Sequence, residues 1–355
     1  MKIAILNDTH AGVRGDMLEM AKYQGRFYNE VFFPYLKENG ITHILHLGDY
    51  FDRRKYVNFS SLKLNREHFI EPLLENGMTM DLIIGNHDTY YKNTNDVNSP
   101  ELLLFGDEAI NVITEPEVKN FDGLDIALVP WINSENYADS VEFLTSANAP
   151  ICMGHFEFEG ALMMPGMTCQ HGLDHSYVKR FEKVYSGHFH QRSEFANIVY
   201  LGSQMQFTWS DYGDNKYFHI FDTDTREMLP VPNPLTIFEK VFYDDTKETF
   251  ETISNRDYSN VTGKFTKVIV VNKDNPYWFD SFLDKIHNAS PLHLNVVDDH
   301  KHMDLMDDAD VENVEDTLTI LNKYVEGMEI QGKKKPLTDL MTSLYNEALD
   351  EHTFL

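Results

Sequence analysis

The chain has 355 residues, 42% hydrophobic and 13% aromatic, which is enough to bury a core in two or three domains. No apolar run reaches the ~18–20 residues of a membrane-spanning helix, so we expect no membrane association. The 57 acidic and 30 basic residues give a net charge of −27, which argues against a protein that grips nucleic acid by itself. Phosphate-directed chemistry would therefore need metal ions or a basic partner.

The first hundred residues alternate strands with helices. Apolar, strand-like runs cover 2–7, 41–47 and 79–85, and helical spacing covers about 16–38 and 59–76. Pro34 is expected to break or end the first helix. The start, MKIAILNDTH, is interpreted as a strand and not a signal peptide, because Asp8 and His10 interrupt it. This alternation predicts a largely parallel sheet with right-handed crossovers.

From about residue 110 the pattern changes to shorter β-like pieces with one helix candidate, 134–147. The pieces are 111–118, 125–132, 150–156, 183–189, 197–203 and 216–222. We expect them to form a second sheet packed against the first, within a domain 1–232. The cysteines of this region, Cys152 and Cys169, are too few for a disulfide framework, so a reducing compartment, the cytoplasm, is expected.

The last third predicts a second unit and a tail. PVPNPLT (230–236) holds three prolines and is interpreted as a linker. Beyond it, strand-like runs and the helical stretch 276–288 predict a small β/α module, 233–300; the runs are 237–243, 264–272 and 292–297. Residues 301–316 are strongly acidic and are interpreted as a solvated linker. Residues 317–355 show helical spacing twice, split by the basic turn GKKKP.

Polar residues of the same kind follow each of the main strand-like runs. In chain order they are Asp8, His10, Asp49, Asn86, His87, Asp88, His155, His188 and His190. Open α/β sheets build their sites at the carboxyl ends of strands, and a preceding glycine lets the chain turn sharply there. In an extended segment residues i and i+2 point to the same side, so His188 and His190 can converge on one point.

This set of side chains suits divalent metal ions. Carboxylates, imidazoles and one amide oxygen favour Mn²⁺, Fe²⁺ or Zn²⁺, whereas the lack of clustered thiolates argues against a structural zinc site. Without His87 and Asp88 the set holds seven candidate ligands. This number is too large for one catalytic ion with open positions and about right for two. Two ions roughly 3.5–4 Å apart can activate a bridging hydroxide and stabilise an in-line displacement at phosphorus.

The ordered motifs DxH…GDxxD…GNHD…GH…GHxH, which span residues 8–190, resemble those of the calcineurin-like metallophosphoesterases. The resemblance implies an α/β fold, the four-layer α-β-β-α sandwich, here with a small capping domain and a C-terminal helical segment. It also implies phosphoester hydrolysis with two divalent ions, Mn²⁺ in the first place and Mg²⁺, Fe²⁺ or Zn²⁺ as alternatives.

Carried over by position, the resemblance implies a role for each residue. In the nuclease branch, one ion would be held by Asp8, His10, Asp49 and His190. The other would be held by Asp49, Asn86, His155 and His188, with Asp49 bridging. His87 would sit beside the scissile phosphate and protonate the leaving oxygen or stabilise the transition-state charge. Asp88 would orient His87.

Within the superfamily the chain is most similar to the SbcD-type nucleases, in particular the recombination endonuclease subunits of T-even-like phages. The resemblance lies in GDYFDRRK (48–55), GNHDTYYKN (85–93), SGHFHQRSEFANIVYLGS (186–203) and the region of Lys216. It implies a DNA exonuclease and endonuclease that acts in double-strand-break repair, recombination and replication.

The same resemblance implies partners. They are DNA and an SbcC-type coiled-coil ABC ATPase, which residues 317–355 would bind. A homodimer within a heterotetramer is implied as well, as is the host cytoplasm if the protein is phage-encoded.

The motifs depart from some relatives at Asp52, where those relatives carry a histidine. Asp52 is expected to support a ligand from behind. The basic triplet after it, Arg53, Arg54 and Lys55, could contact phosphate, although such a charge run is usually a solvated loop. Tyr90, Tyr91 and Lys92 could contact a DNA end, with aromatic packing at a subunit contact as the alternative.

Several histidines have a structural interpretation instead. His43 and His46 are expected in the core or on a sheet face, and His300 and His302 in solvent. His171 and His175 compete with His155 as ligands but lack a preceding strand.

Two other functions stay open. One is a small-molecule or phosphoprotein phosphoesterase on the same scaffold, because the metal site does not encode the substrate. The other is a non-catalytic scaffold subunit, which is disfavoured because every expected ligand and His87 are present. The module and tail after residue 232 favour the nuclease, since a minimal phosphatase needs neither.

Overall fold

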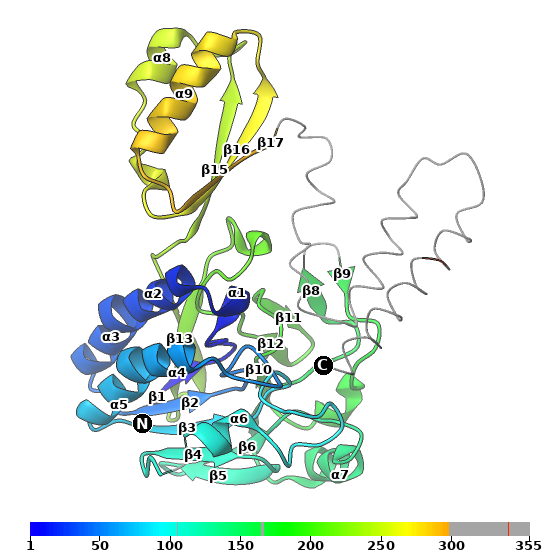
Figure 1. The fold of residues 1–355 in the computed structure, drawn as a ribbon. Coiled ribbons are helices and arrows are strands. Elements are labelled where there is room, and N and C mark those ends of the chain that lie inside the picture. Colours follow the sequence, from blue (N-terminus) through cyan, green and yellow to red (C-terminus); the bar gives the residue numbers. More distant parts are fainter. Residues whose placement is uncertain (105, 165–166, 298–339, 341–355) are drawn as a thin grey trace.

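Two sheets form the main body of the protein (Figure 1). The structure, a computed structural model, describes residues 1–104, 106–164, 167–297 and 340. The first sheet has the order β14-β13-β1-β2-β3-β4, with β1 Lys2–Leu6, β2 His43–His46, β3 Thr79–Ile83, β4 Ile110–Ile113, β13 Tyr217–Asp222 and β14 Glu227–Pro232. The second has the order β11-β12-β10-β7-β6-β5, with β5 Glu117–Phe121, β6 Leu124–Val129, β7 Ile151–Gly154, β10 Lys183–Ser186, β11 Ser193–Phe195 and β12 Ile198–Tyr200.

The central strands of both sheets are parallel. β1, β2, β3 and β4 pair in parallel, whereas β13 and β14 join antiparallel. In the second sheet β6, β7, β10 and β12 are parallel, and β5 and β11 close the two edges antiparallel. Parallel strands present their carboxyl ends at one edge, so the polar residues that follow β1, β2 and β3 share an edge, as do those that follow β7 and β10.

Alternation along the strands explains the layers. Ile3 and Ile5 of β1 pack between the two sheets, whereas Ala4 and Leu6 pack against the helices outside the first sheet. Those helical segments are α2 Leu18–Arg26, η1 Phe27–Phe32, α3 Phe33–Glu38, α4 Phe59–Asn65, η2 Arg66–Ile70 and α5 Glu71–Glu75. On the far side, Leu144 of α7 (Tyr137–Ser146) packs on the second sheet. The predicted four-layer α-β-β-α sandwich is confirmed.

Pro34, which was predicted to break or end the first helix, does not end it. The helix runs on to Glu38 because the turn before Pro34, η1, is π-helical, and Pro72 likewise follows the π-helical η2. A proline ring clashes with the carbonyl four residues earlier, and a widened π turn moves that carbonyl away.

Strand assignments also differ from prediction in two places. Pro230 and Pro232 belong to β14, not to a linker, because an edge strand tolerates residues without an N–H. The pieces at 111–118 and 216–222 were expected in the second sheet. The structure divides the former between β4 and β5, and it puts β13 beside β1 in the first sheet.

A smaller unit follows the main body. Its parallel strands β15 Phe238–Asp244, β16 Phe265–Asn272 and β17 His293–Val297 carry α8 Phe250–Asn255 and α9 Pro276–Asn288 on one face, which Figure 1 shows clearly. Val241, Val268 and Phe282 lie in its own core, whereas Phe238 and Phe265 at its base join the core of the main body.

The shorter elements complete the described chain. They are α1 Val13–Asp16, α6 Ser99–Leu103, β8 Leu162–Met164, β9 Met167–Thr168, η3 His175–Val178, η4 Trp209–Asp211 and η5 Ser259–Val261. Over the ranges that the structure describes, every helix is too short or too polar to cross a membrane. The predicted acidic linker 301–316 and nearly all of the tail 317–355 lie outside those ranges.

Candidate metal centre

The candidate ligands meet where the carboxyl ends of five strands come together. Asp8 and His10 follow β1, Asp49 follows β2, and Asn86 follows β3; His155 follows β7, and His188 and His190 follow β10. The two sheets approach closely here: a Cβ added to Gly187 would lie 2.8 Å from the Leu47 carbonyl oxygen and 3.0 Å from Asp8 Oδ2. Glycine is therefore required beside His188.

The backbone is strained at four of these ligands. Asp8, His10, Asp49 and His188 have φ of 48°, 45°, 55° and 86°, in the left-handed region that side chains other than glycine rarely adopt. Each such residue costs on the order of 1 kcal/mol or more, and such strain gathers at functional sites. The turn at each strand end therefore serves to aim these side chains.

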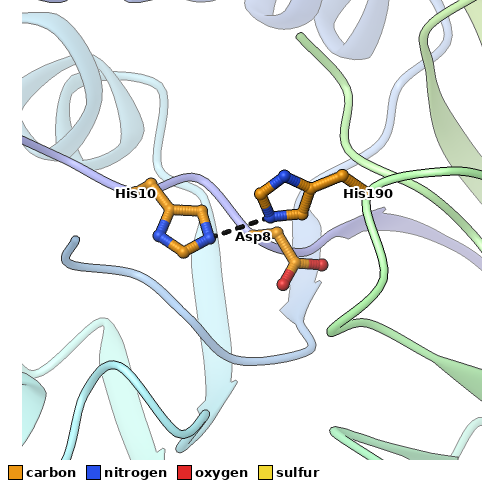
Figure 2. A group of neighbouring side chains, drawn as sticks. All are labelled: Asp8, His10 and His190. Carbon is orange, nitrogen blue, oxygen red and sulfur yellow. Dashed lines mark hydrogen bonds between the residues drawn. The ribbon is translucent and has the colours of Figure 1, made fainter. Parts of the chain in front are cut away.

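One group of potential ligands is Asp8, His10 and His190, whose ligand atoms lie within 4.8 Å of one another (Figure 2). Nε2 of His10 lies 3.1 Å from Nε2 of His190. Asp8 is fully buried, and both its carboxylate oxygens accept from the backbone N–H of His188 at 3.0 Å. Three of the four residues predicted to hold the first ion are thus brought together.

A second group is Asp49, His155 and His188, and a third, His10, Asp52 and His87, shares His10 with the first. Asn86 joins the second group, because its Oδ1 lies 2.9 Å from Nε2 of His155 and 3.0 Å from Nδ1 of His188. Nδ1 of His155 lies 2.8 Å from the Leu47 carbonyl oxygen, so this nitrogen carries the proton and Nε2 faces the site.

Asp49 lies between the two groups. Its Oδ2 is 3.3 Å from Nε2 of His155 and 3.8 Å from Nε2 of His10, while Oδ1 accepts from the backbone N–H of His87 at 2.8 Å. The carboxylate is 2% exposed, so its charge acts in a medium that screens it weakly. This is the arrangement that a bridging ligand requires.

The carboxylates of the site favour positive charge. Burial opposes protonation of His10, but the carboxylates of Asp52 and Asp49 outweigh it and raise its pKa to about 10. Burial of His155 is likewise outweighed, here by Asp49, and its pKa rises to about 9. By contrast, burial and the neighbouring charge of His10 lower the pKa of His190 to about 3. The carboxylates therefore stabilise positive charge at His10 and His155. A divalent metal ion bound to the neutral imidazoles would supply that charge in place of the protons.

His87 lies beside the candidate ligand His10, with ring centroids 4.8 Å apart, but Asp88 does not orient it. Nδ1 of His87 lies 2.6 Å from the backbone carbonyl oxygen of Asp52, so Nε2 is free to act. The carboxylate of Asp88 instead accepts from the backbone N–H groups of Gly85, Tyr50 and Phe51 at 2.9, 2.9 and 3.0 Å. The expected role of Asp88 is wrong, since the backbone takes both of its oxygens. Asp88 thereby connects the GNHD turn (85–88) to the turn that follows β2.

The proposed DNA-contacting residues are not members of the ligand groups found in the described chain. Arg53 lies over the ring of Tyr56 and its Nη1 is 4.0 Å from Asp16 Oδ2. Lys55, Tyr90 and Lys92 are exposed, and Arg54 is half-buried. Their role in contacting DNA stays a prediction.

The histidines given a structural interpretation behave accordingly where the structure describes them. His43 pairs with Asp81 at 2.9 Å, and buried His46 lies 2.9 Å from the Thr9 hydroxyl. His155, and neither His171 nor His175, joins a ligand group. His300 and His302 lie outside the described residues.

Sequence reasoning missed Trp131 and Glu157, which surround the candidate ligands, and named Lys216 only as part of the family resemblance. The Trp131 ring lies 5.5 Å from that of His188, and Oε2 of Glu157 is 3.9 Å from Nε2 of His188. Lys216 is 3% exposed, donates to the His190 carbonyl oxygen at 3.0 Å and pairs with Asp211 at 2.5 Å. Trp131 and Glu157 each follow a strand of the second sheet, which is the signal that could have found them.

A family model described as calcineurin-like phosphoesterase matches residues 1–192. The chain belongs to this family. Calcineurin-like phosphoesterases use a dimetal site, and the His and Asp groups of this chain offer the ligand types that such a site needs. The family predicted from the motifs is thereby confirmed.

Among known calcineurin-like and related proteins, the chain is similar to "Exonuclease subunit 1" of Enterobacteria phage T4. The two are 32% identical over 351 residues, which cover 98% of this chain and 99% of the T4 protein. The similarity to a T-even phage nuclease subunit, predicted from the motifs, is confirmed as well.

Solved structures give weaker likenesses. A dimetal phosphatase from Danio rerio is 12% identical with a TM-score of 0.40, over 66% of this chain and 97% of its own. Pseudomonas putida nuclease MPE is 15% identical with a TM-score of 0.32, over 64% and 87%.

Proposed function

We propose that this phosphoesterase is a metal-dependent DNA nuclease that works as one subunit of a larger complex. The observation that carries the proposal is that Asp49 lies between the group of Asp8, His10 and His190 and the group of His155 and His188, with His87 beside them. The similarity to an exonuclease subunit over nearly the whole chain supports DNA as the substrate. We propose Mn²⁺ as the native ion.

The donor set fits two divalent ions. Asp8, His10, Asp49 and His190 would hold one, and Asp49, Asn86, His155 and His188 the other. When bound, the ions would supply Lewis-acid activation of a water and stabilise the charge of an in-line displacement. The buried carboxylate of Asp49 lies between the two groups. The left-handed backbone conformations fix the directions in which the ligand side chains point.

His87 would complete the chemistry. The Asp52 carbonyl oxygen accepts from its Nδ1, which leaves Nε2 to donate a proton to the leaving oxygen of the scissile ester. The ring is half-buried and stands edge-on to His10, with centroids 4.8 Å apart, so it borders the proposed first ion. Exposed Tyr90 and Lys92 and the 53–55 loop would contact the DNA.

The partner follows from charge. A chain with a net charge of −27 is expected to bind DNA weakly alone and to lose that affinity with modest salt. We propose that an SbcC-type ATPase supplies the basic surface, that 233–300 acts as a capping domain and that 317–355 docks the ATPase. A homodimer within a heterotetramer acting in repair and recombination completes the proposal.

The test is hydrolysis by purified protein with Mn²⁺. Linear DNA and a generic phosphodiester are the substrates, with and without the ATPase, and Asp49→Ala is the matched inactive variant. We expect both substrates to be cut and Asp49→Ala to cut neither, because its loss affects both ions. Substantial activity of Asp49→Ala at saturating Mn²⁺ would disprove the two-metal assignment. Cleavage of the generic ester but never of DNA would favour the small-molecule phosphoesterase.

Truncation at about residue 300 tests the docking proposal separately. The shortened chain should still cut the generic phosphodiester but no longer co-purify with the ATPase. An unchanged complex would rule out the tail as the docking element.

A further inference from the structure

The buried carboxylate of Asp52 lies with His10 and His87 in a group of potential ligands but belongs to neither set proposed to hold an ion. Asp52 is 4% exposed, and both its carboxylate oxygens are shielded from solvent, as is Nδ1 of His10. None of these three atoms has a partner in hydrogen-bond geometry in the described chain. Nδ1 of His10 nevertheless lies 3.3 Å from Oδ1 of Asp52. A buried carboxylate is costly unless it meets a donor, and His10 can offer one at this distance.

The main chain fixes this approach. Beyond the ends of β1 and β2 the two segments stay paired: the N–H of His10 donates to the Asp49 carbonyl oxygen at 3.1 Å, and that of Ala11 to the Tyr50 carbonyl oxygen at 2.8 Å. The N–H of Asp52 then donates back to the Ala11 carbonyl oxygen at 3.1 Å. His10 and Asp52 are therefore held side by side by backbone pairing, independently of their side chains.

The same residue also holds the second functional imidazole. Its backbone carbonyl oxygen is 2.6 Å from Nδ1 of His87. Asp52 thus faces the Nδ1 atoms of both His10 and His87, the first with its side chain and the second with its main chain. A substitution at position 52 removes only the first of these contacts.

We propose that Asp52 is a positioning residue, which keeps the proton of His10 on Nδ1 and directs the Nε2 lone pair toward the first ion. The inference rests on the proposed two-metal function. A neutral imidazole carries its proton on one nitrogen and its lone pair on the other. Nε2 of His10 faces His190 at 3.1 Å and Asp49 at 3.8 Å, which are the other proposed ligands of that ion. Ligating histidines commonly give their second N–H to a carboxylate, whose loss costs ~10–100-fold in metal affinity.

The experiment measures Mn²⁺ binding by titration calorimetry, without DNA. The wild type should bind two ions. Asp52→Ala should bind one of them ~10–100-fold more weakly and leave the other unchanged, because Asp52 touches a ligand of one ion only. Asp52→Asn keeps an oxygen that can accept from Nδ1–H, so its loss should be smaller. Wild-type affinity of Asp52→Ala for both ions, or equal losses at both, would overturn the proposal.

Asp81→Asn is the matched control. Asp81 is a carboxylate of the same sheet, 1% exposed and paired with Lys119 and His43 away from the centre. It should lower stability and leave both Mn²⁺ affinities unchanged, and a weakened site there would mean that loss of any buried carboxylate suffices.

A measurement on the unmutated protein removes dependence on variants that fail to fold. In the Mg²⁺-loaded wild type, long-range ¹H–¹⁵N spectra should show the His10 proton on Nδ1, and a proton on Nε2 would contradict the inference. Wild type that binds two ions but cuts no DNA would sink the proposed function and leave this inference standing.

Discussion

At the scale of single residues, the candidate centre depends on side chains whose directions are set by strained backbone conformations. Asp8, His10, Asp49 and His188 all occupy the left-handed region, and the glycines beside them admit close neighbours. A Cβ on Gly85 would lie 2.2 Å from the backbone nitrogen and from Oδ1 of Asp49. Stability and ligand geometry are therefore linked at this position.

Gly85→Ala should both destabilise the chain and weaken Mn²⁺ binding. The added methyl can be accommodated only if Asp49 moves, and such overpacking costs ~1–3 kcal/mol. Urea unfolding and metal titration measure the two effects. Gly40→Ala, where a Cβ meets nothing within 4 Å but φ is +64°, should cost about 1 kcal/mol and leave metal binding intact. Equal metal affinity in the two variants would contradict the steric argument.

His87→Ser separates binding from chemistry. A residue that acts in the transition state leaves ground-state binding unchanged, so both Mn²⁺ ions and DNA affinity should persist. Turnover should fall by ~10²–10⁴-fold, the usual contribution of a general acid. The comparison variant is His293→Ser, an exposed histidine of β17, which should keep full turnover. Loss of one bound ion in His87→Ser would make His87 a ligand instead.

At the scale of elements, the loop between β12 and β13 joins the centre to the smaller unit. Ser203 N–H and Lys216 Nζ both donate to the His190 carbonyl oxygen at 3.0 Å. In the same loop, Oε1 of buried Gln206 accepts from the N–H groups of Ile237 and Phe238 at 3.0 and 3.3 Å. The base of the smaller unit is thus fastened to the segment that supports a ligand.

Gln206→Ala should loosen that fastening. Two buried N–H groups lose their acceptor, at a cost of ~1–3 kcal/mol each at most. A loss of ~1.4 kcal/mol in the free energy of local opening makes exchange about tenfold faster. Hydrogen exchange at the amides of Ile237 and Phe238 should therefore become faster by about one to two orders of magnitude. Gln170→Ala, at an exposed glutamine, should change neither amide. Unchanged exchange in Gln206→Ala would mean that the packing of Phe238 alone holds the junction.

The elements that sequence predicted well are the ones with local signals. The runs of β1, β2, β3, β7 and β10 are buried on both faces, so each appears as a short apolar run followed by a glycine or polar turn. The membership of β4 and β13 in the first sheet was not predictable, because it depends on pairs such as Ile5 with His219, far apart in sequence.

The candidate site shows the same division. The positions of the candidate ligands could be predicted because polar residues at strand ends are a local pattern, and Asp52 was expected to support one of them. The contacts of Asp88 with backbone N–H groups could not be predicted, since such contacts leave no mark in the sequence. The same holds for the identity of His10 as the imidazole that Asp52 approaches.

At the scale of the whole molecule, lowering the pH should reduce the stability of the fold through a buried histidine. His219 on β13 is 1% exposed, neither ring nitrogen has a hydrogen-bond partner in the described chain, and burial lowers its pKa to about 3. The unfolded chain takes up a proton below about pH 6.5, whereas the folded chain does so only near pH 3, so stability falls as the pH decreases between these values.

The His219 contribution can be measured by urea unfolding between pH 8 and pH 5. At pH 5 the neutral, buried ring should cost the fold about 2 kcal/mol relative to neutral pH. His219→Leu removes this proton uptake, so the difference in unfolding free energy between wild type and variant should shift by that amount across the range. A difference that stays constant with pH would show that His219 can be protonated in the folded state.

Ligands from both sheets would surround each proposed ion. Each proposed ion takes ligands from both: His190 of the second sheet joins Asp8 and His10 of the first, and His155 and His188 of the second join Asn86 of the first. The ions would then connect the two sheets and stabilise the folded chain. A ligand that binds only the folded form, at a concentration a hundred times its dissociation constant, adds about 2.7 kcal/mol to the free energy of unfolding. A chelator should lower the melting temperature of the wild type and leave that of Asp49→Ala nearly unchanged. How long the enzyme survives would in that case follow the supply of metal in its surroundings, so that scarcity removes the protein as well as its activity.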